Sequence, residues 1–201
     1  MSAPGSRGRG RPRDPAVDEA ILDAALRLFI EEGPEGATIE RIAVRAGVGR
    51  PTVYRRWKDK DALLIDAIAT VRERAEQPLG YSATTSVQDV LEWMTTAIPH
   101  ALAQPDSRTL LARLIGAAPD SPELLERYWA EILEPRWTAF GSLMQQASRG
   151  TASDAMLLSD VVAGALVWRI LVRPGTTSEE EIHDFLLQVL ELLGLRGDRA
   201  R

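Results

Sequence analysis

Apolar side chains recur at helical spacing along most of the chain, and no segment shows the alternation of a half-buried strand. Pro and Gly divide this pattern into separate segments. We therefore predict an all-α protein of about nine helices. The expected helices span roughly residues 14–33, 38–46, 50–57, 60–77, 86–103, 106–115, 121–147, 153–173 and 178–193. Pro99 is expected to kink one of them, and Pro135 to kink or split another.

The segment Thr38–Lys60 predicts two short helices around a tight turn. Its first half carries apolar residues at helical spacing, and Gly47-Val48-Gly49 then breaks the helix. Pro51 fits the first turn of a second helix that ends near Trp57, because Pro lacks the N–H that would be unpaired there. A small residue at the crossing, Gly in the turn and a branched residue in the second helix are typical of a helix-turn-helix.

This segment is also strongly basic. Between Arg41 and Lys60 lie seven Lys or Arg residues and one Asp. Val53 and Trp57 are four residues apart and share the buried side, so the other positions face broadly outward. Such a face suits a DNA major groove, and the alternative is a solvated basic surface. The outward set comprises Arg50, Thr52, Arg55 and Arg56, with Tyr54 at the margin.

The stretch A-T-I-E-R-I-A-V-R-A-G-V-G-R-P-T-V-Y-R-R-W-K-D-K-D-A-L-L resembles the DNA-binding domain of TetR-family transcriptional regulators. The resemblance covers roughly residues 16–65. One departure is Gly49, where the family often has a Ser that caps the recognition helix and touches phosphate. The resemblance and the basic face together assign DNA contacts to Thr38, Arg50, Pro51, Thr52, Tyr54, Arg55, Arg56, Lys58 and Lys60. Thr38 is equally explained as a helix cap alone.

Charge divides the chain unequally. The net charge of the 201 residues is −5, but residues 1–60 carry +3 and residues 61–201 carry −8. A basic end that binds DNA and an acidic body follow from this asymmetry. We expect three parts: a disordered basic arm at 1–13, a helix-turn-helix domain at 14–60, and a helical domain for dimerisation and effector binding at 61–201.

The arm contains four arginines, Arg7, Arg9, Arg11 and Arg13, alternating with Gly and Pro. The R-G-R-P sequence resembles the core of an AT-hook, which lies in the minor groove of A·T-rich DNA. The alternative is a basic tail that gives only nonspecific attraction.

The last two predicted helices are the most apolar of the body. One is apolar nearly all round and the other carries a wide apolar stripe, as a four-helix dimer interface requires. TetR-like proteins dimerise in this way. The alternative is that both helices complete a core within one chain. The interface predicted from these helices comprises Val161, Gly164, Leu171, Ile182, Phe185, Leu186, Val189, Leu190 and Leu193.

Four of the five Trp residues lie in the body. Several Trp side chains in one helical body often line a cavity, and the resemblance implies a pocket for a hydrophobic or aromatic effector. For any one residue, ordinary core packing explains the position equally well. The predicted lining comprises Trp93, Met94, Arg113, Trp129, Trp137, Phe140, Met144 and Trp168.

No catalytic motif, metal site or cofactor fingerprint is visible, and the chain has no Cys. We expect a cytoplasmic protein without a membrane span, because the longest apolar run is too short for one. The expected function is a dimeric repressor that binds palindromic DNA and is released by a small apolar effector. A DNA-binding dimer without an effector, or an enzyme or carrier built on the helical body, are the alternatives.

Overall fold

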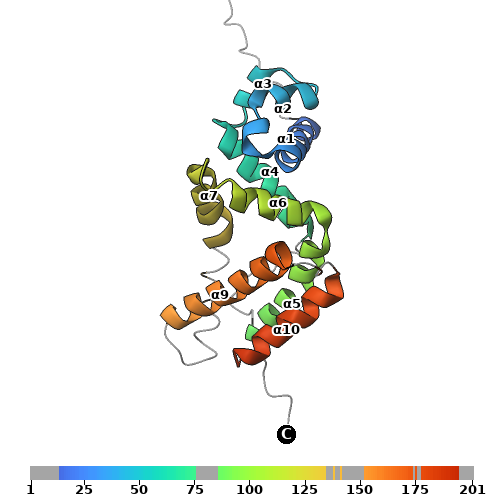
Figure 1. Cartoon of the computed structure of the whole chain (residues 1–201). Coiled ribbons are helices and arrows are strands. Elements are labelled where there is room, and N and C mark those ends of the chain that lie inside the picture. Colours follow the sequence, from blue (N-terminus) through green and yellow to red (C-terminus); the bar gives the residue numbers. More distant parts are fainter. Residues whose placement is uncertain are drawn as a thin grey trace, which may run out of the picture.

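The computed structural model describes residues 14–75, 86–134, 138, 141, 152–173, 175 and 178–194. In these residues the secondary structure is entirely helical, with nine α-helices, two short π-helical segments and no strand. The predicted all-α fold is confirmed. In Figure 1, α1, α2 and α3 gather at one end of the molecule, and α9 and α10 lie toward the other end.

Helix α1 (Pro15–Gly36) begins where the sequence pattern predicts. The Asp14 side chain caps it by accepting the backbone N–H of Ala16 at 3.1 Å. Gly33 has a φ of 77°, which favours glycine, and Pro34 follows it. The regular helix therefore breaks at the predicted place, and one further turn carries the chain to Gly36.

Helices α2 (Ile39–Arg45) and α3 (Arg50–Tyr54) form the predicted helix-turn-helix. Gly47 adopts a φ of 68° in the turn, and the N–H of Val48 donates to the carbonyl of Ala43 at 2.9 Å. Helix α3 is shorter than predicted, because its helical hydrogen bonding gives way to a turn at Arg55 and Arg56.

Helix α4 (Lys60–Ala75) runs from this unit toward the body (Figure 1). The Asp59 carboxylate caps it by accepting the N–H of Ala62 at 2.7 Å. Its buried side, which includes Leu64 and Ile68, packs against α1. Helix α4 thus belongs both to the helix-turn-helix end and to the link with the body.

The body begins with α5 (Val87–Ala103), α6 (Pro105–Gly116), α7 (Pro122–Tyr128) and the π-helical segment η1 (Trp129–Leu133). Ser86 and Asp89 form the predicted capping box at the start of α5. Helix α5 continues through Pro99 to Ala103, as predicted.

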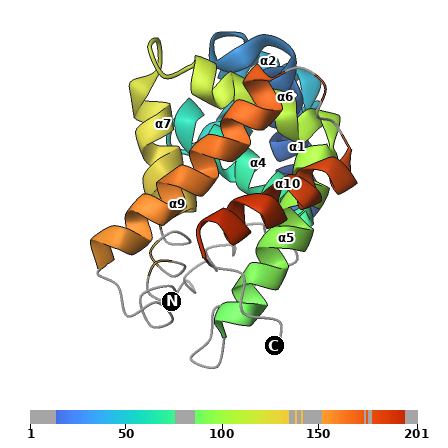
Figure 2. The same ribbon diagram turned by 60° about the horizontal axis from the view of Figure 1, so that its bottom comes forward.

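Two apolar cores hold the described helices together. The first joins α1–α4 to α6, α7 and η1, so it crosses the predicted domain boundary at residue 60. The second lies between α5, α9 (Ala152–Val167) and α10 (Glu179–Leu192). Figure 2, turned so that this end of the molecule comes forward, shows these three helices on the near side. The second core comprises Val90, Met94, Val162, Leu166, Ile182 and Leu186.

Helix α10 corrects part of the predicted dimer interface. Ile182 and Leu186 are fully buried and Leu190 is 2% exposed within a single chain. These side chains are inaccessible to a second subunit, so their assignment to a dimer interface is wrong. Phe185, Val189 and Leu193 are half-buried against the same core. The periodic stripe of α10 is a buried face, as predicted, and it packs on α5 and α9 of the same chain.

Helix α9 and the π-helical segment η2 (Trp168–Val172) differ from α10, because most of their predicted interface residues are exposed in the single chain. Val161, Gly164 and Trp168 are exposed at helical spacing, and Leu171 is half-buried.

None of the described helices is both long and apolar enough to cross a membrane.

Candidate nucleic-acid interface and body cavity

The recognition helix α3 is anchored through its apolar side. Val53 is fully buried and Trp57, just beyond the helix, is 7% exposed. The Trp57 indole N–H donates to the Asp66 carboxylate at 2.7 Å, which ties the end of the unit to α4. The prediction that Trp57 is a scaffold residue is confirmed.

The remaining side of this unit faces outward. Arg50, Pro51, Tyr54, Arg55 and Lys58 are exposed, and Thr52 is half-buried. Within the described part of the chain, no ion pair or hydrogen bond is found for the Arg55 guanidinium, so it is available to a partner. This arrangement presents a short basic helix, the form that enters a major groove.

Arg56 does not belong to this outward face. Its side chain is only 8% exposed and forms an ion pair with Asp18 of α1. Its Nη1 also donates to the Thr52 carbonyl at 3.1 Å. The prediction that Arg56 points outward is wrong, because burial and Asp18 fix it between α1 and α3. Spacing alone could not reveal this, since the partner lies 38 residues away.

Arg50, the first residue of α3, is paired within the chain. Its Nη1 lies 2.5 Å from Oε1 of Glu40, and both side chains are more than half exposed. The hydrogen bond from Arg50 is the main cause that lowers the pKa of Glu40 below its ordinary value. Sequence reasoning missed Glu40 because one acidic residue on a basic segment carries no pattern of its own.

Two further ion pairs attach α2 to the end of α1. Arg45 binds Glu31 through two hydrogen bonds of 2.6 and 2.7 Å, and Arg41 binds Glu32. Hydrogen bonds from these arginines lower the pKa values of both glutamates. Much of the positive charge counted in the segment is therefore neutralised inside the unit.

Thr38 and Lys60, the two remaining residues predicted to contact DNA, form hydrogen bonds within the chain. The Thr38 hydroxyl caps α2 by accepting the N–H of Arg41 at 3.3 Å, so its role as a cap is confirmed. The Lys60 ammonium donates to the Pro34 carbonyl at 3.1 Å. A phosphate contact from either residue stays a prediction. The arm residues Arg7, Arg9, Arg11 and Arg13 lie outside the described residues.

An apolar cavity of about 250 Å³ lies in the body. Helices α4, α5, α6, α7, η1 and α9 all contribute to its walls. Its lining comprises Val71, Ile98, Ala101, Leu102, Ser107, Leu110, Leu111, Leu114, Tyr128, Trp129, Leu133, Ala163, Leu166 and Val167.

Among the predicted lining residues that the structure describes, only Trp129 borders this cavity. Trp93 and Met94 pack in or against the second core, and Trp168 is 62% exposed. Trp137, Phe140 and Met144 lie outside the described residues. The Leu-rich stripe of α6 was the missed signal, because aliphatic residues line most of the wall.

Arg113, the other predicted lining residue, has a different position. Its Nε donates to the Ile30 carbonyl at 3.2 Å and its Nη2 to the Glu31 carbonyl at 2.9 Å. These bonds hold α6 against the end of α1. Helix α6 also supplies Leu110 and Leu114 to the cavity, so this helix connects the cavity to the helix-turn-helix unit.

Helix α7 makes a second connection. The Arg127 guanidinium lies 3.0 Å from Asp59, which caps α4 directly after the recognition unit. The pKa of Asp59 is lowered overall: burial acts to raise it, but the hydrogen bonds from Ala62 and Arg127 outweigh that effect. Two residues after Arg127, Trp129 borders the cavity.

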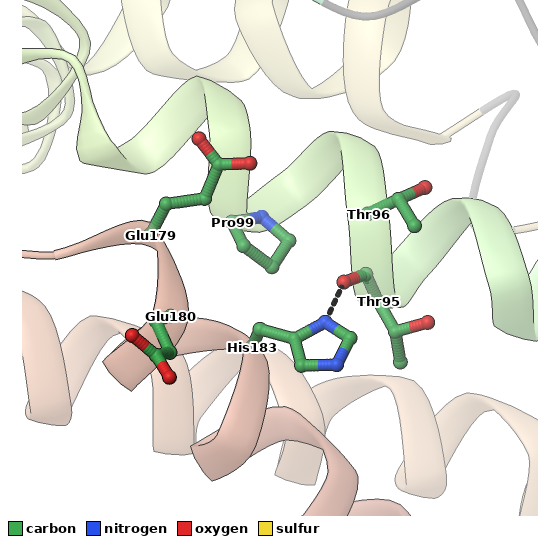
Figure 3. A pocket seen from close by; sticks show the side chains of 6 residues that line it. All are labelled: Thr95, Thr96, Pro99, Glu179, Glu180 and His183. Carbon is green, nitrogen blue, oxygen red and sulfur yellow. Dashed lines mark hydrogen bonds between the residues drawn. The ribbon is translucent and has the colours of Figure 1, made fainter.

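A shallower pocket lies between α5 and α10, lined by Thr95, Thr96, Pro99, Glu179, Glu180 and His183 (Figure 3). His183 Nδ1 binds the Thr95 carbonyl, as the dashed line in Figure 3 marks. Since a carbonyl only accepts, Nδ1 carries the proton. Neither here nor elsewhere among the described residues do three or more His, Asp or Glu side chains gather as a metal site.

Comparison with known proteins agrees with this geometry. Residues 21–67 match the family described as bacterial regulatory proteins, tetR family, and residues 83–189 match the tetracyclin repressor-like C-terminal domain. YdeS of Bacillus subtilis, an uncharacterized HTH-type transcriptional regulator, is 28% identical over 188 residues, which cover 91% of this chain and 92% of YdeS.

Two further similarities extend the comparison. The HTH-type transcriptional regulator AqdR of Rhodococcus erythropolis is 31% identical over 174 residues, covering 84% of this chain and 80% of AqdR. The solved structure of the flavonoid-responsive regulator FrrA matches 93% of this chain and 100% of its own, with a TM-score of 0.67 and 19% identity. At that identity the likeness concerns the fold.

Proposed function

The chain belongs to the TetR family of DNA-binding transcriptional regulators, which are not enzymes, and on this premise we propose that it is a ligand-responsive repressor. The proposed protein binds a palindromic operator as a homodimer and leaves it when a small apolar molecule enters the body. The observation that carries this proposal is the apolar cavity, because one of its walls, α6, also holds α1 of the DNA-facing unit.

For DNA, we propose that Arg50, Thr52, Tyr54 and Arg55 contact bases or phosphates. Lys58, Lys60, Thr38 and Pro51 lie at the edges of α3 or at helix starts and are proposed to border the backbone. Arg56 is left out, because its guanidinium is occupied by Asp18. Exposure of the Arg55 side chain and the basic character of the segment support these assignments.

The basic arm extends this proposal into the minor groove. Arg7, Arg9, Arg11 and Arg13 supply up to four additional phosphate-neutralising groups. Deleting residues 1–13 is expected to lower affinity and flatten the dependence of binding on salt. Equal salt slopes for the full and truncated proteins would remove the arm from the proposal.

Cavity size and lining support an apolar effector. At about 250 Å³ the cavity lies slightly below the roughly 300–1,000 Å³ of typical small-molecule sites, which suits a compact ligand. Its lining is mainly Leu, Val, Ile and Ala with Tyr128 and Trp129. The flavonoid-responsive character of FrrA supports an aromatic compound as one class to test.

The proposed mechanism is a shift between two conformations of the dimer. The DNA-competent state holds the two recognition helices one turn of DNA apart, about 34–36 Å. A ligand that favours a displaced α6 draws the protein from this state, since Arg113 carries the displacement to α1. Arg127 provides the parallel connection from α7 to α4.

The test begins with an operator duplex selected by the protein from a random pool. Binding of this duplex is measured by fluorescence anisotropy with and without flavone, and then with a set of apolar aromatic and acyl compounds. A responsive compound should weaken operator binding and quench part of the intrinsic Trp fluorescence, to which Trp129 at the cavity contributes. If every compound left operator affinity unchanged, the alternative of an effector-independent DNA-binding dimer would replace the proposal.

A pair of variants on α5 tests whether the ligand binds in the apolar cavity. Ala101→Phe fills the cavity, because Ala101 borders it, whereas Ala103→Phe places the same side chain on the same helix outside the lining. We expect Ala101→Phe to keep operator binding but lose the response to the ligand. Ala103→Phe should keep both. Equal responses in the two variants would place the ligand elsewhere.

A further inference from the structure

The start of the recognition helix carries an unusual partner. Arg50 is the first residue of α3, and Glu40 lies in the first turn of α2. The two side chains meet at 2.5 Å, with 59% of Arg50 and 54% of Glu40 exposed. In the described part of the chain, this ion pair links α3 to an exposed carboxylate on α2.

The acceptor in this pair has the same chemistry as the acceptors on DNA. A carboxylate, a phosphate and the O6/N7 edge of guanine all accept hydrogen bonds from the guanidinium fork. Because Glu40 occupies Nη1, a two-point contact from Arg50 to DNA through both terminal nitrogens requires this ion pair to open. After it opens, the Glu40 charge remains close to the negatively charged duplex.

We propose that Glu40 is an intramolecular competitor of DNA for Arg50 and thereby lowers the affinity of the regulator for DNA. The inference rests on the proposed contact between Arg50 and DNA. Glu40 is then a residue that sets affinity without contributing an attractive contact.

Exposure limits the size of the effect. An ion pair in solvent contributes little, since water and salt screen it. Removing the carboxylate should therefore raise affinity by about 1.5- to 5-fold and not by orders of magnitude.

The dependence of DNA binding on salt concentration provides a second signature of the competition. In the wild type, the negative charge of Glu40 beside Arg50 offsets part of the positive charge brought to the duplex, so fewer cations are released from DNA than a lone Arg50 would release. Without Glu40, the salt slope should steepen by up to about 0.9 per Arg50.

The ion pair between Arg45 and Glu31 offers a matched control. It has the same residue types and also lies in the DNA-facing unit, but it joins α2 to the end of α1 and leaves α3 untouched. Glu31→Gln therefore changes the net charge by the same amount as Glu40→Gln. An effect that belongs to Arg50 should appear only with Glu40→Gln.

Four variants of the full chain test the inference: Glu40→Gln, Glu31→Gln, Arg50→Ala, and Glu40→Gln combined with Arg50→Ala. Each is titrated with a short duplex of arbitrary sequence and with the selected operator over a series of KCl concentrations. Urea unfolding checks that each variant is folded. We expect a gain in affinity and a steeper slope for Glu40→Gln alone, a loss for Arg50→Ala, and no gain from Glu40→Gln once Arg50 is absent.

The other outcomes separate the two proposals. If Arg50→Ala weakens binding but Glu40→Gln changes nothing, the competitor role is overturned and the Arg50 contact stands. A gain that also appears with Glu31→Gln, or that persists without Arg50, reflects net charge alone and overturns the inference. Unchanged binding by Arg50→Ala overturns the proposed Arg50 contact and the inference with it.

Discussion

Arg55 and Arg56 are neighbours in the sequence, but one guanidinium faces outward while the other is held by Asp18 of α1. We predict that Arg55→Ala lowers operator affinity by about 1–3 kcal/mol with little effect on stability, because it removes an exposed contact. Arg56→Ala should instead lower the free energy of unfolding by about 2 kcal/mol, since Asp18 loses its partner. Anisotropy and urea unfolding measure the two effects. If Arg55→Ala lowered stability and Arg56→Ala lowered only operator affinity, the result would contradict the exposure of Arg55 and the burial of Arg56.

Gly49 is a second residue whose replacement has a definite expectation. It is the N-cap of α3 and makes no side-chain cap, while its φ of −78° and ψ of 145° suit any residue. A Cβ added there meets only Pro51 Cδ, at 3.6 Å, which is ordinary contact. Gly49→Ser should therefore stabilise the protein by a few tenths of a kcal/mol, about what a hydroxyl cap adds over Gly.

The matched control at this position is Gly49→Ala, which has a Cβ but no hydroxyl. Thermal unfolding should rank Ser above Gly and Gly above Ala, because Ala is a poor N-cap. An equal stabilisation by Ser and Ala would show that lost backbone freedom, and not the cap, determines the effect.

At the scale of helices, Pro99 explains how α10 docks on α5. Pro99 has no N–H to give to the Thr95 carbonyl four residues earlier, and His183 of α10 donates to that carbonyl instead (Figure 3). We predict that His183→Leu lowers the free energy of unfolding by about 1–2 kcal/mol, because the carbonyl then loses its donor in a partly buried place.

A double-mutant cycle tests this explanation. In a Pro99→Ala background, the restored N–H of residue 99 can satisfy the Thr95 carbonyl within the helix, so His183→Leu should cost less there than in the wild type. Urea unfolding of the four proteins gives the coupling. The same cost in both backgrounds would show that His183 acts through packing alone.

The helices themselves were largely predictable because their signals are local. The caps at Asp14, Thr38, Ser86 and Ser178 each depend on residues within a few positions, and all four form. The turn at Gly47 likewise follows from a single residue type. The π-helical segments η1 and η2 carry no such local signal, and the pattern predicted ordinary helix there.

Contacts between distant residues were not predictable in the same way. Periodicity shows that Leu186 lies on a buried face, but it does not say whether that face meets another helix of the chain or another subunit. The prediction that Leu186 contacts a second subunit is therefore wrong, because the side chain is buried within its own chain. The cavity was missed for a similar reason, because Trp168 signals bulk and apolarity but not direction. Arg56 shows the same limit for a charged residue.

At the scale of the whole molecule, α9 and η2 present an apolar stripe to solvent. Its members recur three or four residues apart, and Gly164 within the stripe leaves open space for close approach. We infer that this stripe, rather than the buried face of α10, joins two subunits. The exposed apolar side chains are Leu157, Val161, Trp168 and Val172.

Trp168→Glu is the sharpest test of this interface, because it places a charge within the stripe where 62% of the Trp is exposed. We predict conversion of the dimer to a monomer in sedimentation velocity and a large loss of operator affinity, since one recognition helix reads only half of a palindrome. Secondary structure should be retained, because the side chain is not part of either core.

Two controls separate association from folding. Ile115→Glu adds the same charge at an exposed apolar position on α6, away from the stripe, and should leave the dimer intact. Leu186→Ala removes a fully buried side chain, so it should lower the free energy of unfolding by about 2–5 kcal/mol without producing a folded monomer. If Trp168→Glu remained dimeric while Leu186→Ala dissociated, the subunits would meet through α10 and the assignment of its face to the intrachain core would have to be abandoned.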